Sequence, residues 1–203
     1  MQGNYATPQS GQTTVAVKFT AAQGLGDLNV VVVGWNDTTA AVSSVVDSSG
    51  NAYALAVGPT KVSGTLSQSI YYAKNIASAA AGANTVTVTF TTAAFAADIR
   101  ILEYKGADPN SPVDVTAAST GNGTTSSSGA VLTTNSADLL FGANIVTSIT
   151  SRAGTGFTKR LLTSPDGDIA EDQMVTTTGS YSATAPLSSG AWIMQLVAFK
   201  AAH

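Results

Sequence analysis

Residues 28–35 read LNVVVVGW, and this stretch decides the fold class. A continuous apolar run of this length is expected of a central strand that is covered on both faces. The preceding run, residues 13–20, alternates instead and places Val15, Val17 and Phe19 on one face. The two patterns predict one fully buried strand and one half-buried strand.

Turn residues separate further short runs of the same kind. The segment DSSGN at residues 47–51 is a turn signal whose glycine tolerates positive φ, so residues 42–46 and 52–57 are predicted to form a hairpin. The other predicted strands are 67–74, 84–91, 98–105, 130–133, 138–147, 157–162, 169–177 and 191–200. About a dozen short strands without an amphipathic helix predict an all-β, two-sheet β-sandwich of jelly-roll type.

The two halves of the chain resemble each other. Residues 98–105 read DIRILEYK and residues 193–200 read IMQLVAFK. When the two segments are aligned, large apolar residues coincide at 99 and 194, 101 and 196, 102 and 197, and 104 and 199. This pattern fits two duplicated Greek-key halves, although alternating strands also look alike by chance.

Residues 116–129 are rich in Thr, Ser and Gly and divide the chain near its middle. Such a segment is either a linker between two domains or a long connection within one. Each half has too few strands to cover both faces of its apolar runs, which favours one domain. We expect residues 1–12 to be a flexible N-terminal segment or linker and residues 13–203 to form a single β-sandwich domain.

Composition excludes several partners. Charged residues make up 10% of the chain and the net charge is −3, against about 25% charged residues in a typical domain. Basic residues are scattered except for Lys159 and Arg160, so we expect no nucleic acid partner. The longest apolar stretch, near residues 30–33, is too short for membrane insertion.

The compartment predicted from composition is extracellular, either secreted or at the cell surface. The chain has no Cys and is rich in uncharged polar residues, as in many bacterial surface proteins, although the lack of Cys also suits the cytosol. Residues 1–4 have neither the basic start nor the apolar core of a signal peptide. We therefore expect a secreted form to derive from a longer chain.

Four segments carry a resemblance to a known class of module. They are DSSGNAY at 47–53, IYYAK at 70–74, NTVTV at 84–88 and EYKG at 103–106. Together they resemble a β-sandwich module of large secreted bacterial proteins, which are adhesin-like or carry polysaccharide-active domains beside it. The resemblance spans most of the chain and implies an extracellular β-sandwich module. It implies no particular ligand and no site residues.

Catalytic signatures are missing from the sequence. The sole histidine is His203, at the end of the chain, so His-dependent triads have no internal member. Glycoside hydrolysis needs two facing carboxyl groups. Glu103 has no acid two residues further on, and the neighbours Glu171 and Asp172 point to opposite faces of a strand. We expect no enzyme activity, and a polysaccharide-active enzyme is the third hypothesis.

The densest acidic segment predicts a metal site. Calcium prefers carboxylate and carbonyl oxygens. The predicted ligands of a structural calcium ion are Asp166, Asp168, Glu171 and Asp172. A second oxygen-rich loop contains Asp47 and Asn51. The alternative for both segments is that the Asp and Asn side chains bond their own backbone in turns.

Aromatic residues beside polar ones predict a carbohydrate site. Sugar-binding modules place an aromatic ring against the apolar face of a pyranose and polar side chains against its hydroxyls. The predicted ligand-binding residues are Trp35, Asn36, Asp37, Tyr71, Tyr72 and Trp192. The alternative for each ring is packing in the core.

The leading hypothesis is a non-catalytic extracellular module for carbohydrate binding or adhesion, whose partner is a polysaccharide or cell-surface glycan. The second hypothesis is a structural or assembly module of a surface protein, filament or shell. A weakly charged surface provides little electrostatic protection against pairing between strand edges, so self-association is compatible with the sequence.

Overall fold

The structure is a computed structural model that describes residues 1–202, and His203 lies outside these residues. The described residues form fifteen strands and no helix. Accordingly, no helix within residues 1–202 is long and apolar enough to cross a membrane. The strands build two five-stranded sheets, one three-stranded sheet and one two-stranded sheet. The predicted all-β class is confirmed.

The first half of the chain forms a sandwich of two sheets. The five-stranded sheet has the order β1 (Gln2–Ala6), β8 (Asp98–Tyr104), β3 (Leu28–Trp35), β6 (Leu66–Ala73) and β5 (Ala54–Val62). The three-stranded sheet has the order β2 (Gln12–Lys18), β7 (Thr85–Ala94) and β4 (Val42–Asp47). Val15, Val17 and Phe19 face the core between them, as their alternation predicts.

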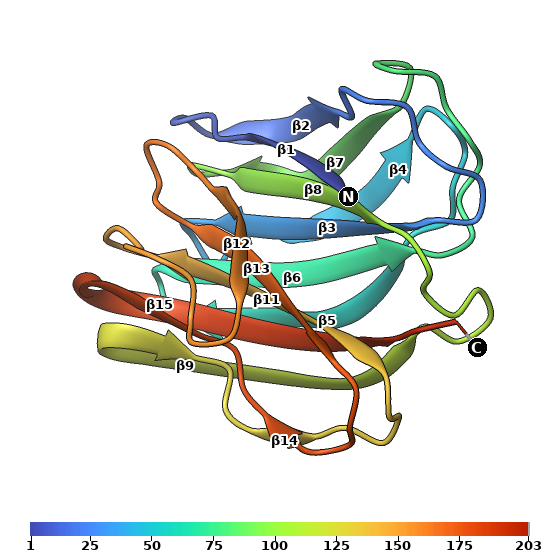
Figure 1. Ribbon diagram of the computed structural model, residues 1–203. Helices are drawn as coiled ribbons and strands as arrows, with labels where there is room; N and C mark the ends of the chain where they lie inside the picture. Colours follow the sequence, from blue (N-terminus) through green and yellow to red (C-terminus); the bar gives the residue numbers. More distant parts are fainter. Residues whose placement is uncertain (203) are drawn as a thin grey trace.

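The second half builds the other five-stranded sheet. Its order is β12 (Thr158–Leu162), β13 (Ile169–Val175), β11 (Asp138–Val146), β15 (Thr184–Lys200) and β9 (Val113–Ser127). The two-stranded sheet pairs β10 (Val131–Leu132) with β14 (Ser180–Tyr181). Figure 1 shows the first half in blue to green and the second half in yellow to red.

The sheet that contains β3 is a middle layer. Val31, Val33 and Trp35 face the core of the first half. Leu28, Val30 and Val32 face the opposite way and share a second core with Phe141 and Phe199 of the other five-stranded sheet. Every residue of β3 is buried, which confirms that LNVVVVGW is a central strand covered on both faces. The architecture therefore has more layers than the two sheets that we expected.

The two five-stranded sheets repeat one topology. In chain order, β1, β3, β5, β6 and β8 correspond to β9, β11, β12, β13 and β15, and the spatial order of the two sets is the same. The pair β2 and β7 corresponds to β10 and β14. We call residues 2–104 and 113–200 the first and second repeat. This correspondence supports the duplication hypothesis, whereas the jelly-roll detail stays a prediction.

The aligned apolar residues of the two repeats lie in corresponding layers. Leu102 and Val197 both face the core between the repeats, as do Tyr104 and Phe199. Ile99 and Ile101 face the outer core of the first repeat, and Met194 and Leu196 face the outer core of the second. The similarity in sequence therefore marks equivalent positions in space.

Two segments expected to be irregular are strands. Residues 1–12 were predicted to be flexible, but Gln2–Ala6 forms β1 and pairs with β8 along its whole length. Residues 116–129 were predicted to be a connection, but most of them lie in β9, which pairs with β15. For the residues in β1 and β9 both expectations are wrong, because hydrogen bonding to a neighbouring strand outweighs weak apolar patterning, and the Thr residues of β9 suit an extended backbone.

Candidate functional site

A cavity of about 170 Å³ lies at one side of the first repeat. Its wall comes from β3, the connection to β4, β4 itself, β5 and β6. The wall residues are Trp35, Ala40, Ala41, Val42, Pro59, Lys61, Ser69 and Tyr71. We call this feature the Trp35 cavity.

An irregularity in β5 shapes one wall of the Trp35 cavity. The pairing of β5 with β6 shifts register between Val57 and Thr60. Gly58 lies within this shift at a φ of 114°, where a Cβ would come within 2.7 Å of the carbonyl oxygen of Gln68. Glycine is therefore required here. As β-bulges do elsewhere, the shift re-aims the following residues, and Pro59 and Lys61 line the cavity.

Two polar atoms of the wall residues are covered, Nε1 of Trp35 and Oγ of Ser69, on residues that are each 1% exposed. The Ser69 hydroxyl lies within hydrogen-bonding reach of the Tyr71 hydroxyl. The indole packs edge-on against Phe90, with ring centroids 5.6 Å apart. A buried polar group without a partner, such as Nε1 of Trp35, destabilises a fold by about 1–3 kcal/mol. Because this atom is covered, a ligand in the cavity does not reach it.

Asp37 anchors the loop beside the cavity. Its Oδ1 accepts hydrogen bonds from the backbone N–H groups of Thr39 and Ala40, at 2.9 and 2.8 Å, and its Oδ2 accepts one from Phe95 at 2.9 Å. Partial burial alone would raise the pKa of Asp37, but these donors outweigh it and hold the pKa below its usual value. Asp37 is thus engaged within the fold, whereas Asn36 is exposed.

The structure brings together two of the predicted aromatic residues. Trp35 and Tyr71 both line the cavity. Tyr72 points to the other face of β6 and packs against Phe199, with centroids 5.9 Å apart. Trp192 is 9% exposed in the outer core of the second repeat. Neither Trp35 nor Trp192 therefore presents an exposed, flat ring, because both faces of β3 are covered and Trp192 packs in the outer core of the second repeat.

Sequence reasoning missed Pro59, Lys61 and Ser69. No local signal marks them, because they meet Trp35 only through the pairing of β6 with both β3 and β5. The Gly58-Pro59 pair was the one available hint, since these residues are typical of bulges and strand interruptions.

The predicted calcium ligands point in different directions. Asp172 binds Arg160, with an Oδ2 to Nε distance of 2.7 Å. Glu171 lies on the other face of β13 and accepts a hydrogen bond from the N–H of Gly154 at 2.8 Å. Asp166 accepts one from the amide of Gln9 at 2.8 Å. Within residues 1–202, no three His, Cys, Asp or Glu side chains are grouped so that they could hold a metal ion.

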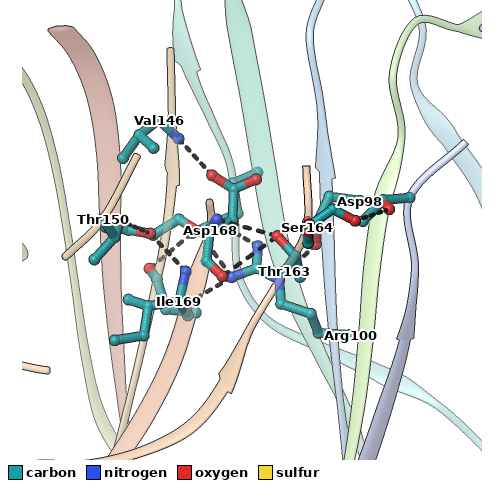
Figure 2. A network of polar contacts seen from close by, with 12 residues as sticks. Asp98, Arg100, Val146, Thr150, Thr163, Ser164, Asp168 and Ile169 are labelled. Carbon is teal, nitrogen blue, oxygen red and sulfur yellow. Dashed lines mark hydrogen bonds and ion pairs between the residues drawn. The ribbon is translucent and has the colours of Figure 1, made fainter. Parts of the chain in front are cut away.

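Asp168, the fourth predicted ligand, belongs to a buried network between the repeats (Figure 2). Its Oδ1 accepts a hydrogen bond from the N–H of Val146 at 2.8 Å. Nearby, Nε of Arg100 lies 2.7 Å from Oδ1 of Asp98. Burial raises the pKa of both Asp98 and Asp168, and the negative charge of Asp98 raises the pKa of Asp168 further.

Arg100 extends from the first repeat into the second, as Figure 2 shows. Its Nη1 donates to the carbonyl oxygens of Asn144 and Ile169 at 2.8 and 2.6 Å. Its Nη2 donates to Gln68 at 3.3 Å. All of these groups are buried, so the network joins the repeats and offers no route to a solvent-borne ligand.

The oxygen-rich loop at Asp47 is also engaged internally. Oδ2 of Asp47 accepts hydrogen bonds from Asn51, Tyr53 and Asn84 at 2.7, 3.0 and 3.0 Å. Its Oδ1 accepts one from the N–H of Asn51 at 3.0 Å. Residues of the segments DSSGNAY and NTVTV thus hold together one end of the first repeat.

Two carboxyl pairs occur elsewhere. Asp27 contacts Glu103, and Asp138 contacts Asp114. Burial, followed by the neighbouring carboxyl group, raises the pKa of Asp27. Burial and the negative charge of Asp114 likewise raise the pKa of Asp138. Neither pair lines the Trp35 cavity.

The Trp35 cavity is therefore the candidate site. It combines aromatic rings, a tyrosine hydroxyl group and one charged side chain, whereas the acidic clusters are engaged by internal donors. Comparison of the chain with protein-family models, curated proteins and solved structures finds no match.

Proposed function

We propose that the chain is a non-catalytic module that binds one sugar residue of a glycan in the Trp35 cavity. The observation that carries this proposal is the cavity wall itself, which combines the rings of Trp35 and Tyr71 with apolar side chains and the charged group of Lys61. Ligand sites typically combine apolar walls with a few placed polar groups.

A sugar ring matches this combination. Its C–H faces are apolar and suit Tyr71, Pro59 and Val42, while its oxygens can accept hydrogen bonds from Lys61 and the Tyr71 hydroxyl. The ring would enter the cavity as a terminal or side-chain residue of a glycan. This differs from stacking along a flat row of exposed aromatic rings.

The test is a glycan panel measured by calorimetry, with and without calcium, because a structural calcium ion is also predicted. Replacing Trp35 itself would leave a large hole in the core and lower stability by about 3–5 kcal/mol. Ala41→Trp is preferable, because Ala41 is exposed and its larger side chain would fill the cavity. Ala80→Trp is the matched control at an exposed position outside the cavity wall.

We expect wild type and Ala80→Trp to bind the same glycan and Ala41→Trp to lose it. Failure of every glycan to bind, or equal binding by Ala41→Trp, would reject the cavity as a sugar site. An extracellular, adhesive setting belongs to the same proposal and is supported by the Cys-free composition with few charges.

Assembly through strand edges is a second candidate. β9 has fifteen residues and, among the described strands, pairs with β15 alone. Its sequence contains one charged residue, Asp114, so little opposes pairing with another copy. Sedimentation velocity tests this idea: Thr120→Lys, at an exposed position of β9, should shift any oligomer to monomer. A monomeric wild type would reject it.

A further inference from the structure

We infer that the Trp35 cavity selects a sugar residue that carries a carboxylate, such as a uronic acid, over its neutral counterpart. This inference rests on the proposed function and concerns the same site. It follows from the kinds of polar group that the wall contains, and from the single charge among them.

Each polar side chain of the wall carries a hydrogen-bond donor. The ammonium group of Lys61 can only donate, whereas the indole Nε1 of Trp35, also a donor, is covered. Ser69 and Tyr71 carry hydroxyl groups, which donate as well as accept. No wall side chain has a carboxylate or an amide oxygen. A ligand that presents acceptors therefore fits this wall better than one that presents hydroxyl donors.

Asp37, in the loop that follows Trp35, does not alter this balance. Asp37 is outside the cavity wall, and both of its oxygens already accept backbone hydrogen bonds from Thr39, Ala40 and Phe95. A neutral sugar that offers several hydroxyl donors would find mainly the oxygens of Ser69 and Tyr71 among the wall side chains.

Lys61 supplies the charge that an acidic sugar needs. Its Nζ donates to the carbonyl oxygen of Thr38 at 2.8 Å, a neutral partner. Within residues 1–202 the two ion pairs are Arg100 with Asp98 and Arg160 with Asp172, so Lys61 has no carboxylate partner there. The remaining hydrogens of its ammonium group are available, and charge-assisted hydrogen bonds are stronger than neutral ones.

The experiment compares matched sugars. Calorimetric titrations of wild type with galacturonic acid and galactose, and with glucuronic acid and glucose, separate the effect of the carboxylate from that of the ring. Short oligomers of each sugar repeat the comparison. Lys61→Gln removes the charge from the cavity. Lys74→Gln is the matched control, because Lys74 is also exposed and also donates to a backbone carbonyl, that of Asn110.

We expect wild type and Lys74→Gln to bind an acidic sugar at least about tenfold more tightly than its neutral counterpart. Lys61→Gln should lose this preference, so that the affinity for the acidic sugar falls to that for its neutral counterpart. Equal binding of acidic and neutral sugars by wild type would overturn this inference while preserving the proposed sugar site. A preference that survives in Lys61→Gln would overturn it too. No binding of any sugar would reject both proposals.

Discussion

Tyr71 and Glu171 occupy equivalent positions in the two repeats. Tyr71 pairs with Val31 of β3, and Glu171 pairs with Gly142 of β11, the corresponding central strand. Tyr71 lines the Trp35 cavity. Glu171 is instead fully buried, and the N–H of Gly154 donates to its Oε2. The same place in the topology is therefore open in the first repeat and occupied by a covered carboxyl group in the second.

Glu171 should make stability depend on pH. Burial raises its pKa to about 7 from an ordinary 4.5, because the hydrogen bond from Gly154 only partly offsets desolvation. The carboxyl group of Glu171 ionises at a lower pH in the unfolded chain than in the folded protein. Its contribution to the free energy of unfolding is therefore fully present below about pH 4.5 and is lost as the pH rises through 7. The shift corresponds to about 3 kcal/mol at pH 8.

The measurement is urea unfolding of wild type and Glu171→Gln at pH 5 and pH 8. The Gln side chain cannot ionise. The unfolding free energy of the variant minus that of wild type should therefore be about 2–3 kcal/mol larger at pH 8 than at pH 5. The other buried acids titrate in both proteins and cancel in this difference. An equal difference at pH 5 and pH 8 would contradict the raised pKa.

Arg100 should hold the repeats together. Arg100→Met would leave Asp98 without its cation and would remove the donors to Asn144 and Ile169 of the second repeat. Removing one partner of a buried ion pair typically lowers stability by about 3–5 kcal/mol. The double variant Arg100→Met, Asp98→Asn should recover part of the loss, because it no longer buries an unpaired carboxylate.

Denaturant unfolding followed by both circular dichroism and tryptophan fluorescence checks this prediction. Trp35 and Trp192 lie in different repeats, so fluorescence reports on both of them. Unfolding curves that differ between circular dichroism and fluorescence would reveal repeats that unfold independently. A loss below about 1 kcal/mol in Arg100→Met would show that the network is not important for stability.

The fold and the site differ in how far the sequence predicts them. Alternation along β3 puts Val31, Val33 and Trp35 on one face, and the same rule puts Arg100 on a face with Leu102. The burial of Trp35 and Arg100 was therefore accessible from the pattern, although aromatic and charged residues invite a surface interpretation.

Other features had no such signal. β1 has the sequence QGNYA, without apolar alternation, and becomes a strand only because β8 offers it a partner. The cavity depends on how β5, β6 and β3 are placed side by side, which is a long-range property. The sequence alone does not determine the register shift between β5 and β6. It therefore does not show that Lys61 and Trp35 line the same cavity.

Gly58 should be essential for the shape of the cavity. In Gly58→Ala the added Cβ would meet the carbonyl oxygen of Gln68 at 2.7 Å and Oγ of Ser69 at 2.8 Å, at a φ of 114°. Gly50→Ala is a suitable control, because φ there is 74° and no atom lies within 4 Å of the new Cβ. Backbone strain alone costs about 1–3 kcal/mol.

We expect thermal unfolding to show a larger loss in Gly58→Ala than in Gly50→Ala, since only the first adds a steric clash with backbone. Sugar affinity should also fall in Gly58→Ala, because Pro59 and Ser69 would shift. Similar losses in both variants would mean that the β5 irregularity adjusts without cost.

Tyr53 should stabilise the end of the first repeat through its hydroxyl group. That group donates to Oδ2 of Asp47 at 3.0 Å and accepts from the amide of Asn29 at 3.1 Å. In Tyr53→Phe both bonds are lost while the ring stays, so stability should fall by about 1–3 kcal/mol, as for a buried polar group left unpaired.

Tyr72→Phe is the control, because the Tyr72 ring packs on Phe199 and no hydrogen bond of its hydroxyl occurs within residues 1–202. Urea unfolding of the two variants should differ clearly. If Tyr53→Phe and Tyr72→Phe lose the same stability, the hydrogen bonds of the Tyr53 hydroxyl to Asp47 and Asn29 do not stabilise this end of the repeat.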